Sequence, residues 1–149
     1  MDDVRSVDEG IHGYFLEDLS VGMSAAYSRT ITDADIVLFA GVSGDTNPVH
    51  LNEEYASQTM FKGRIAHGML SAGFISTVLG TKLPGPGTIY MSQSLKFKAP
   101  VRAGDTVTAR VTVTDIVPEK KRLTLRTVCT VGGKDVIEGE AVVMVPSRG

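Results

Sequence analysis

Residues 68–79, GMLSAGFISTVL, are apolar or small at almost every position, and this stretch decides the fold. A helix with that composition on all faces has to be covered by other structure on most sides in a globular protein. We therefore predict a central core helix from Gly68 to about Leu79. The rest of the chain is expected to wrap around it.

Downstream of this helix the hydrophobic period changes to that of β-strands. The segments that alternate or are rich in β-branched side chains are residues 88–98, 106–117, 122–131 and 135–145. Their separators are short, which predicts antiparallel neighbours, because parallel strands need a crossover of a dozen or more residues. With a first strand at residues 22–31, the chain is predicted to be an α+β domain whose antiparallel sheet curls around the central helix.

Upstream, local signals predict two more helices and a tail. Thr32 caps a helix whose first turn is acidic, and Gly44 is expected to end it. Asn52 is predicted to cap a short second helix. Residues 1–12 are too polar to bury enough surface to order themselves, so we expect a flexible tail at 1–12 and a single domain at 13–149.

Composition excludes several classes of partner. The 149 residues carry a net charge of -2 with mixed signs along the chain, so the basic stripe of a nucleic-acid-binding protein is missing. The N-terminus has no apolar run long enough for a signal peptide or a membrane span. Cys129 is the single cysteine, which excludes an internal disulfide and suits a reducing compartment. We expect a cytoplasmic protein without a membrane partner.

Between the predicted helices lies the sequence GDTNPVH, residues 44–50. Pro48 fixes its own φ and disfavours helical conformation at Asn47, so we expect a rigid, non-helical bend that presents Asp45 and His50. A carboxylate and an imidazole held in this way suit general acid–base activation of water. The alternative is that Asp45 caps a turn and His50 is an ordinary loop histidine.

Residues 39–50, FAGVSGDTNPVH, together with Ala56, resemble the signature of the (R)-specific enoyl-CoA hydratases, the MaoC-like branch of the hot-dog fold. Residues 64–70 resemble the entry to that family's central helix, and residues 87–105 resemble its following strand and turn. The resemblance implies a hot-dog fold. It also implies hydration of trans-2-enoyl-CoA to (R)-3-hydroxyacyl-CoA, or the reverse dehydration.

The same resemblance implies roles for four residues. Asp45 and His50 match the catalytic pair, which would hold a water, take its proton as it attacks C3 and return a proton to C2; the division of these transfers stays open. The N–H of Gly68 would hold the thioester oxygen, since a helix N-terminus offers free donors; the alternative is a glycine that only needs room. Ser76 would orient the pair, or else bond back to its own helix.

Other residues are assigned supporting roles. His67 is expected to act structurally at the start of the central helix. Asn47 is expected to brace the bend by its side chain and is a substrate-binding candidate. Leu79 and Met144 are the candidate walls of an acyl pocket. The candidates for contact with the coenzyme A phosphates are Lys62, Arg64, Lys96 and Lys98.

No metal and no cofactor are expected. The three histidines lack the spacing of a zinc site, and the glycines at 85–87 form no phosphate-binding loop for a nicotinamide or flavin. Coenzyme A enters as part of the thioester substrate.

A sheet edge and an incompletely covered helix predict a homodimer, in agreement with the resemblance. The alternative functions are a hot-dog acyl-CoA thioesterase, which residues 68–79 disfavour by containing no Asp or Glu, and a noncatalytic acyl-CoA-binding module. Acyl chain length, the choice between coenzyme A and acyl carrier protein, and the pathway are left open.

Overall fold

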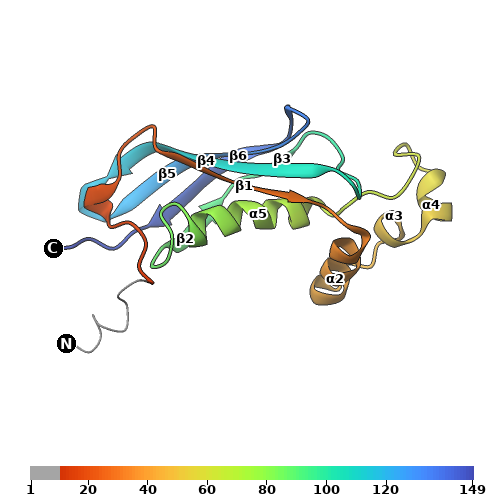
Figure 1. The fold of residues 1–149 in the computed structure, drawn as a ribbon, viewed down its shortest axis with the longest axis horizontal. Coiled ribbons are helices and arrows are strands. Elements are labelled where there is room, and N and C mark those ends of the chain that lie inside the picture. Colours follow the sequence, from red (N-terminus) through yellow and green to blue (C-terminus); the bar gives the residue numbers. More distant parts are fainter. Residues whose placement is uncertain (1–10) are drawn as a thin grey trace.

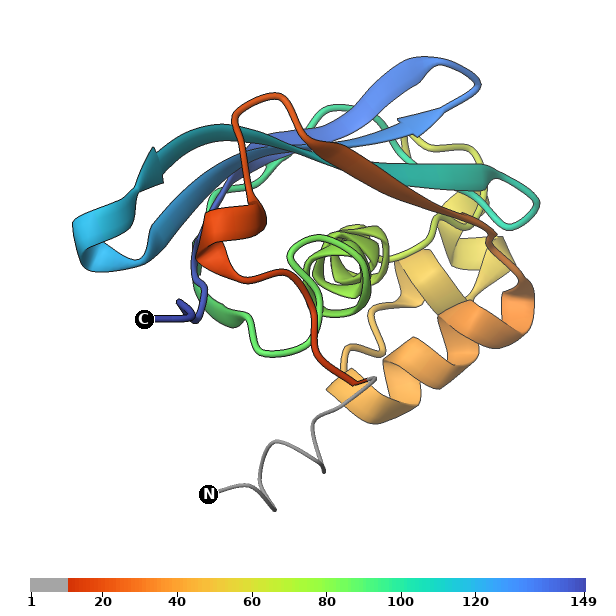
Figure 2. The ribbon, with the colours of Figure 1, turned by 60° about the vertical axis from the view of Figure 1, so that its left-hand side comes forward.

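A curved antiparallel sheet wraps around one long helix in the computed structural model, which describes residues 11–149. This helix, α5 (Gly68–Thr81), runs beneath the sheet (Figure 1) and is seen nearly end-on in Figure 2. Three smaller helices, α2 (Asp33–Ser43), α3 (Pro48–Leu51) and α4 (Glu53–Ser57), lie together beyond one end of the sheet (Figure 1). The predicted α+β class and central helix are confirmed.

The sheet has six strands, all paired antiparallel. They are β1 (Ser24–Thr30), β2 (Ile89–Gln93), β3 (Lys96–Phe97), β4 (Thr106–Val117), β5 (Arg122–Val131) and β6 (Lys134–Met144). Their order is β1-β4-β5-β6-β2, and β3 also pairs with β6. Short 3-10 turns, η1 (Leu16–Asp18) and η2 (Pro118–Lys120), complete the elements.

One strand prediction is wrong. Residues 88–98 were expected to form a single strand beside 106–117, but they divide into β2 and β3, and both pair with β6. The reason is that β1 already occupies the outer edge of β4. Between β2 and β3 the backbone comes very close to β6, because the carbonyl of Ser94 lies where a side chain at Gly139 would be.

The core lies between the concave face of the sheet and α5. Alternate residues of β4 are fully buried there, and they are Val107, Ala109, Val111 and Val113. They belong to the same buried cluster as Ile75, Val78 and Leu79 of α5. Each buried Val, Ile or Leu side chain contributes roughly 1.5–3 kcal/mol to the free energy of folding, so this interface fixes the position of α5 and of its N-terminus.

The ends of the small helices follow their local signals with one exception. Thr32 caps α2 in a reciprocal capping box with Asp35, and Gly44 ends α2 with φ +79°. Asn52 caps α4 as predicted. The bend was expected to be non-helical throughout, but Pro48 is the first residue of α3, where a missing N–H costs nothing, so His50 lies on a helical turn.

The predicted tail, residues 1–12, lies mostly outside the described residues. In the described part, the ring of His12 stacks on Phe15 with 4.2 Å between ring centroids. No helix in residues 11–149 has the length and apolar character needed to cross a membrane.

Candidate active site

A cavity of about 620 Å³ opens where the first turn of α5 faces the segment that follows α2. Its wall includes the bend with α3, the start of α5, and residues 97–101 at the end of β3 and beyond it, together with side chains from α2, residues 60–61 and β6. The polar residues on the wall include Asp45, His50, His67 and Ser71. The structure therefore brings the predicted catalytic pair and the N-terminus of α5 to one cavity.

Asp45 is placed by the end of α2. Its backbone N–H donates to Ser43 Oγ (3.1 Å), and its Oδ1 accepts the N–H of Asn47 (3.2 Å). Asn47 in turn caps α3, because its side-chain oxygen accepts the N–H of Val49 (3.1 Å). The Asn47 side chain braces the bend as predicted, and the exposed carboxylate of Asp45 keeps acceptor capacity free for a ligand.

His50 is held by a backbone carbonyl in a defined tautomer. Its Nδ1 lies 2.8 Å from the oxygen of Ile65. Because a carbonyl oxygen only accepts, Nδ1 carries a hydrogen, so in the neutral imidazole the lone pair is on Nε2. The imidazole is 8% exposed. His50 thus presents a proton acceptor at the cavity without a further rearrangement.

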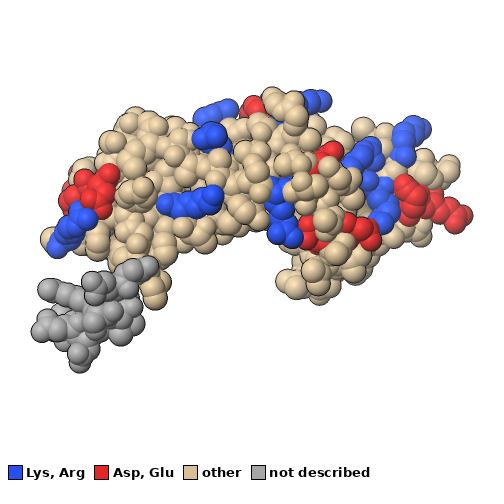
Figure 3. Space-filling model, in the orientation of Figure 1, with Lys and Arg blue, Asp and Glu red and all other residues tan. Residues whose placement is uncertain are grey.

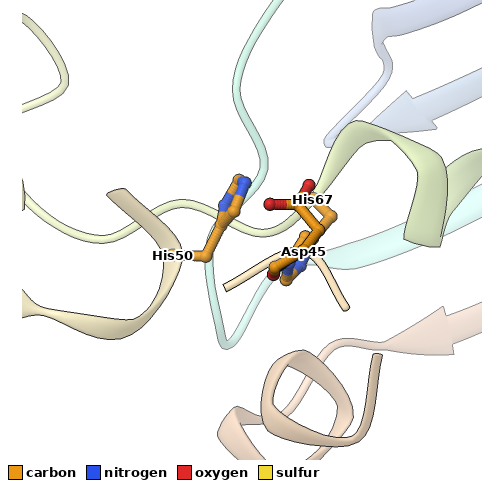
Figure 4. A group of neighbouring side chains, drawn as sticks. All are labelled: Asp45, His50 and His67. Atoms are coloured by element: carbon orange, nitrogen blue, oxygen red, sulfur yellow. Dashed lines mark hydrogen bonds between the residues drawn. The ribbon is translucent and has the colours of Figure 1, made fainter. Parts of the chain in front are cut away.

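His67 connects α5 to both catalytic candidates. It occupies the N-cap position of α5 and is 2% exposed. Its Nε2 donates to the backbone oxygen of Asp45 (2.9 Å), and its ring stacks on His50 with 3.8 Å between centroids and 26° between planes. Figure 4 shows the three side chains gathered from three separate segments. The expected structural role of His67 thus extends to the placement of the bend.

The spacing of this trio suits a water molecule. One oxygen of Asp45 and one ring nitrogen each of His50 and His67 lie within 4.8 Å of one another. A single water with hydrogen bonds of about 2.8 Å can span such a distance between two groups. These three atoms are also close enough together to ligate one metal ion, although Nε2 of His67 and Nδ1 of His50 already contact the carbonyls of Asp45 and Ile65.

The start of α5 provides the opposite side of the cavity. Gly68 is the first residue of α5, a position whose N–H has no partner inside the helix. A side chain at Gly68 would meet the ring of Phe97 at 2.5 Å. With the Phe97 ring in this position, a larger residue at 68 would have to displace it, whatever the amide of Gly68 does.

Ser71 is a cavity residue that sequence reasoning missed. It lies one turn into α5, lines the cavity and is 0% exposed, and its Oγ has no hydrogen-bond partner within residues 11–149. Nothing in the local sequence distinguishes it from Ser76. Only the direction in which α5 faces the bend reveals it.

Comparison with known proteins identifies the family. The MaoC-like domain matches residues 20–140. The chain belongs to the MaoC-like family. Over 144 residues it is 69% identical to an (R)-specific enoyl-CoA hydratase of Rhodospirillum rubrum, covering 97% of this chain and 99% of that protein. It is also 49% identical over 134 residues to a 3-hydroxybutyryl-CoA dehydratase of Methylorubrum extorquens, covering 90% and 85%.

Solved structures agree with the hot-dog arrangement of this MaoC-like chain. An unliganded R-hydratase from Pseudomonas aeruginosa superimposes with a TM-score of 0.86 at 46% identity and covers 91% of this chain and 88% of its own. An (R)-hydratase from Aeromonas caviae, named for its involvement in PHA biosynthesis, gives 0.84 at 45% identity, covering 87% and 99%. The predicted family and fold are confirmed.

Four predicted site residues of the MaoC-like chain are absent from the wall of this cavity, namely Asn47, Ser76, Leu79 and Met144. Ser76 is exposed in a neighbouring hollow of about 420 Å³ between α5 and β2. A helix rises 1.5 Å per residue, which places Ser76 about 12 Å along α5 from Gly68. Leu79 is buried in the core still farther along, and Met144 ends β6 opposite Ile89. Leu79 and Met144, the candidate walls of an acyl pocket, therefore lie away from the cavity of Asp45 and His50.

The basic residues that are candidates for contact with coenzyme A phosphates differ in the bonds that they already make in the MaoC-like chain. Arg64 is occupied, because it pairs with Asp33 (2.7 Å) and donates from Nε to the carbonyl of His50 (2.7 Å). Lys98 lines the cavity and makes only a long 3.4 Å contact with Glu138. Lys98 is therefore better placed than Arg64 to meet an anionic ligand.

Proposed function

We propose that this protein catalyses the reversible, (R)-specific hydration of trans-2-enoyl-CoA to (R)-3-hydroxyacyl-CoA. The observation that carries the proposal is the convergence of Asp45, His50 and the N-terminus of α5 on one cavity. Hydration of an enoyl thioester needs a group that activates water and donors for the thioester oxygen. The names of the relatives in Rhodospirillum rubrum and Aeromonas caviae support the same reaction.

In the proposed reaction, Asp45 and His50 hold one water between them. The lone pair of His50 Nε2 accepts a proton as the water oxygen forms a bond to C3 of the substrate. The electron pair of the C2–C3 double bond moves toward the thioester oxygen, and a proton from the pair is then added to C2. Water is thereby added across the double bond with no oxidant.

The thioester oxygen gains negative charge in this step. In our proposal the N–H of Gly68 donates to it at the positive end of the α5 dipole. General acid–base groups and a backbone amide supply all the chemistry, so we propose that no metal or cofactor takes part. Coenzyme A is then only the carrier of the acyl group.

One assay separates this function from its alternatives. The protein is incubated with crotonyl-CoA while the enoyl absorbance and the release of free thiol are followed together. We expect absorbance to fall without thiol release. Thiol release would identify a thioesterase, which needs a carboxylate that α5 does not contain. Binding without either change would identify a noncatalytic acyl-CoA-binding module.

We also propose that the protein works as a homodimer. The edge strand β2 and the start of α5 expose large apolar side chains, which are Met69, Ile89, Tyr90 and Met91. Figure 3 shows charged side chains at both ends of the view and several basic side chains across its middle and upper edge, with uncharged surface around them. A second copy that covers β2 would also remove the open sheet edge. Light scattering during size-exclusion chromatography should give twice the 15.9 kDa chain mass; a monomer at micromolar concentration would refute it.

The cellular setting is proposed to be the cytoplasm. Support comes from Cys129, whose free thiol is buried under the sheet. A free thiol is typical of proteins from reducing compartments. Fractionation of cells that produce the tagged full-length chain would test this, and its appearance in a secreted fraction would contradict the proposal.

A further inference from the structure

Ser71 carries an unexplained hydroxyl at the centre of the cavity wall. Its side chain is fully buried, it lines the cavity of Asp45 and His50, and no group within residues 11–149 accepts or donates a hydrogen bond to Oγ. Leaving a buried hydroxyl unpaired is costly for folding, so such a group in a folded protein calls for a ligand or a functional reason.

Three other hydroxyls in the helices of this chain make a local bond. They donate to the carbonyl four residues earlier, as Ser43 does to Phe39, Thr77 to Gly73 and Thr81 to Thr77. This back-bonding is the usual state of helical serine and threonine. Ser71 has no such bond to His67, although its position in α5 would allow one. Its hydroxyl is therefore available to a molecule in the cavity.

Helix geometry indicates that this hydroxyl lies near the turn that contains Gly68. Residues three apart on a helix share a face, and their side chains lean toward the helix N-terminus. Ser71 Oγ consequently lies over the turn that begins at Gly68, which lines the same cavity. From behind, Cys129 Sγ contacts the Ser71 carbonyl at 3.6 Å, which fixes this part of α5 against the sheet.

We propose that Ser71 is a catalytic residue whose hydroxyl donates a second hydrogen bond to the thioester oxygen of the bound acyl-CoA. This inference rests on the proposed hydratase function. The Gly68 amide and the Ser71 hydroxyl then form a pair of donors, one backbone and one side chain, around the oxygen that gains charge. A thioester that reaches them displaces the ring of Phe97, which covers Gly68 and is 53% exposed on its outer side.

The proposal predicts an unusual combination of effects for Ser71→Ala. The substitution removes a buried, unpaired hydroxyl, so the melting temperature should stay the same or rise. Loss of one donor to a developing oxyanion should lower kcat by about 100-fold. Ser71→Thr keeps the hydroxyl and should recover most of kcat. A hydroxyl needed only for the fold would instead give a lower melting temperature.

The experiment measures kcat and KM for crotonyl-CoA, with melting temperature, for wild type, Ser71→Ala, Ser71→Thr and a matched control. The control is Thr77→Ala, which removes a hydroxyl that bonds within the same helix, and its kcat should equal that of wild type. A wild-type kcat in Ser71→Ala, or a loss that Ser71→Thr does not restore, would overturn the proposal. Inactive wild-type protein would instead refute the hydratase function itself.

Discussion

The contact between His67 and Asp45 leads to a prediction about how the catalytic pair is held. In His67→Phe, the aromatic ring can still stack on His50, but the carbonyl of Asp45 loses its donor at 2.9 Å. Asp45 is an exposed residue, so water can replace part of the lost bond, and the net contribution of such a hydrogen bond is about 0.5–1.5 kcal/mol. The same substitution also removes His67 Nδ1, which is buried without a partner in the described chain and carries a cost of the same kind. We therefore expect the free energy of unfolding to change by less than about 1 kcal/mol.

Activity should respond much more than stability. Without the bond from His67, the Asp45 carboxylate is free to drift relative to His50, and a displacement of about 1 Å can lower a rate by about 100-fold. His67→Gln, whose amide can donate to the same carbonyl, should recover part of kcat although it loses the stacking on His50. KM should change little in both variants, because neither group is proposed to bind the thioester.

The assay pairs crotonyl-CoA hydration with urea unfolding for wild type, His67→Phe and His67→Gln. A wild-type kcat in His67→Phe would refute the reasoning. So would equal activity in the two variants, since only one of them retains a donor for Asp45. A fall in unfolding free energy of several kcal/mol in His67→Phe would show that the residue acts through the fold alone.

Three further predictions concern the surroundings of the cavity. Gly68→Ala should lower kcat/KM because its methyl group meets the Phe97 ring at 2.5 Å. Adding Phe97→Ala should restore activity if the Gly68 amide donates to the thioester oxygen. No recovery would contradict that role. Lys98→Ala should raise KM for crotonyl-CoA about two- to fivefold, and added salt should diminish this effect. The control Lys120→Ala in η2 should leave KM unchanged. Equal KM values for the two variants would exclude Lys98 from substrate binding. Burial raises the pKa of the Cys129 thiol to about 12, so iodoacetamide at pH 8 should leave the folded protein unmodified. The unfolded chain loses the thiol proton at lower pH than the folded protein does, so the free energy of unfolding should decline as pH rises above about 9. Modification of Cys129 without unfolding would contradict this prediction.

The fold was predictable where local chemistry decides it. Thr32 and Gly44 mark the ends of α2 by their capping chemistry, and the apolar run at 68–79 marks α5. The pairing of β2 was not predictable, because it depends on which edge of the meander is still free after β1 has paired with β4. Which strand pairs with which edge therefore depends on contacts between segments that are far apart in the sequence.

Part of the candidate site was also predictable from the sequence, and part was not. Asp45 and His50 lie in one short motif, so their neighbourhood could be predicted. His67 meets them only through the packing of α5, across 22 residues of sequence from Asp45. Ser71 and Ser76 are both serines of α5 and differ by about 140° around its axis at 100° per residue. The sequence does not say which of these faces turns toward the bend, and the structure places Ser71 there.

The central claim is tested most directly by following crotonyl-CoA through wild type, Asp45→Asn and His50→Gln, with chiral analysis of the product. We expect wild type to give (R)-3-hydroxybutyryl-CoA without releasing thiol. Each variant should lose at least about 100-fold in kcat, the usual contribution of a general acid or base, while keeping the wild-type melting temperature within a few degrees. Hydration at wild-type rates by both variants, or formation of the (S) product, would contradict the account.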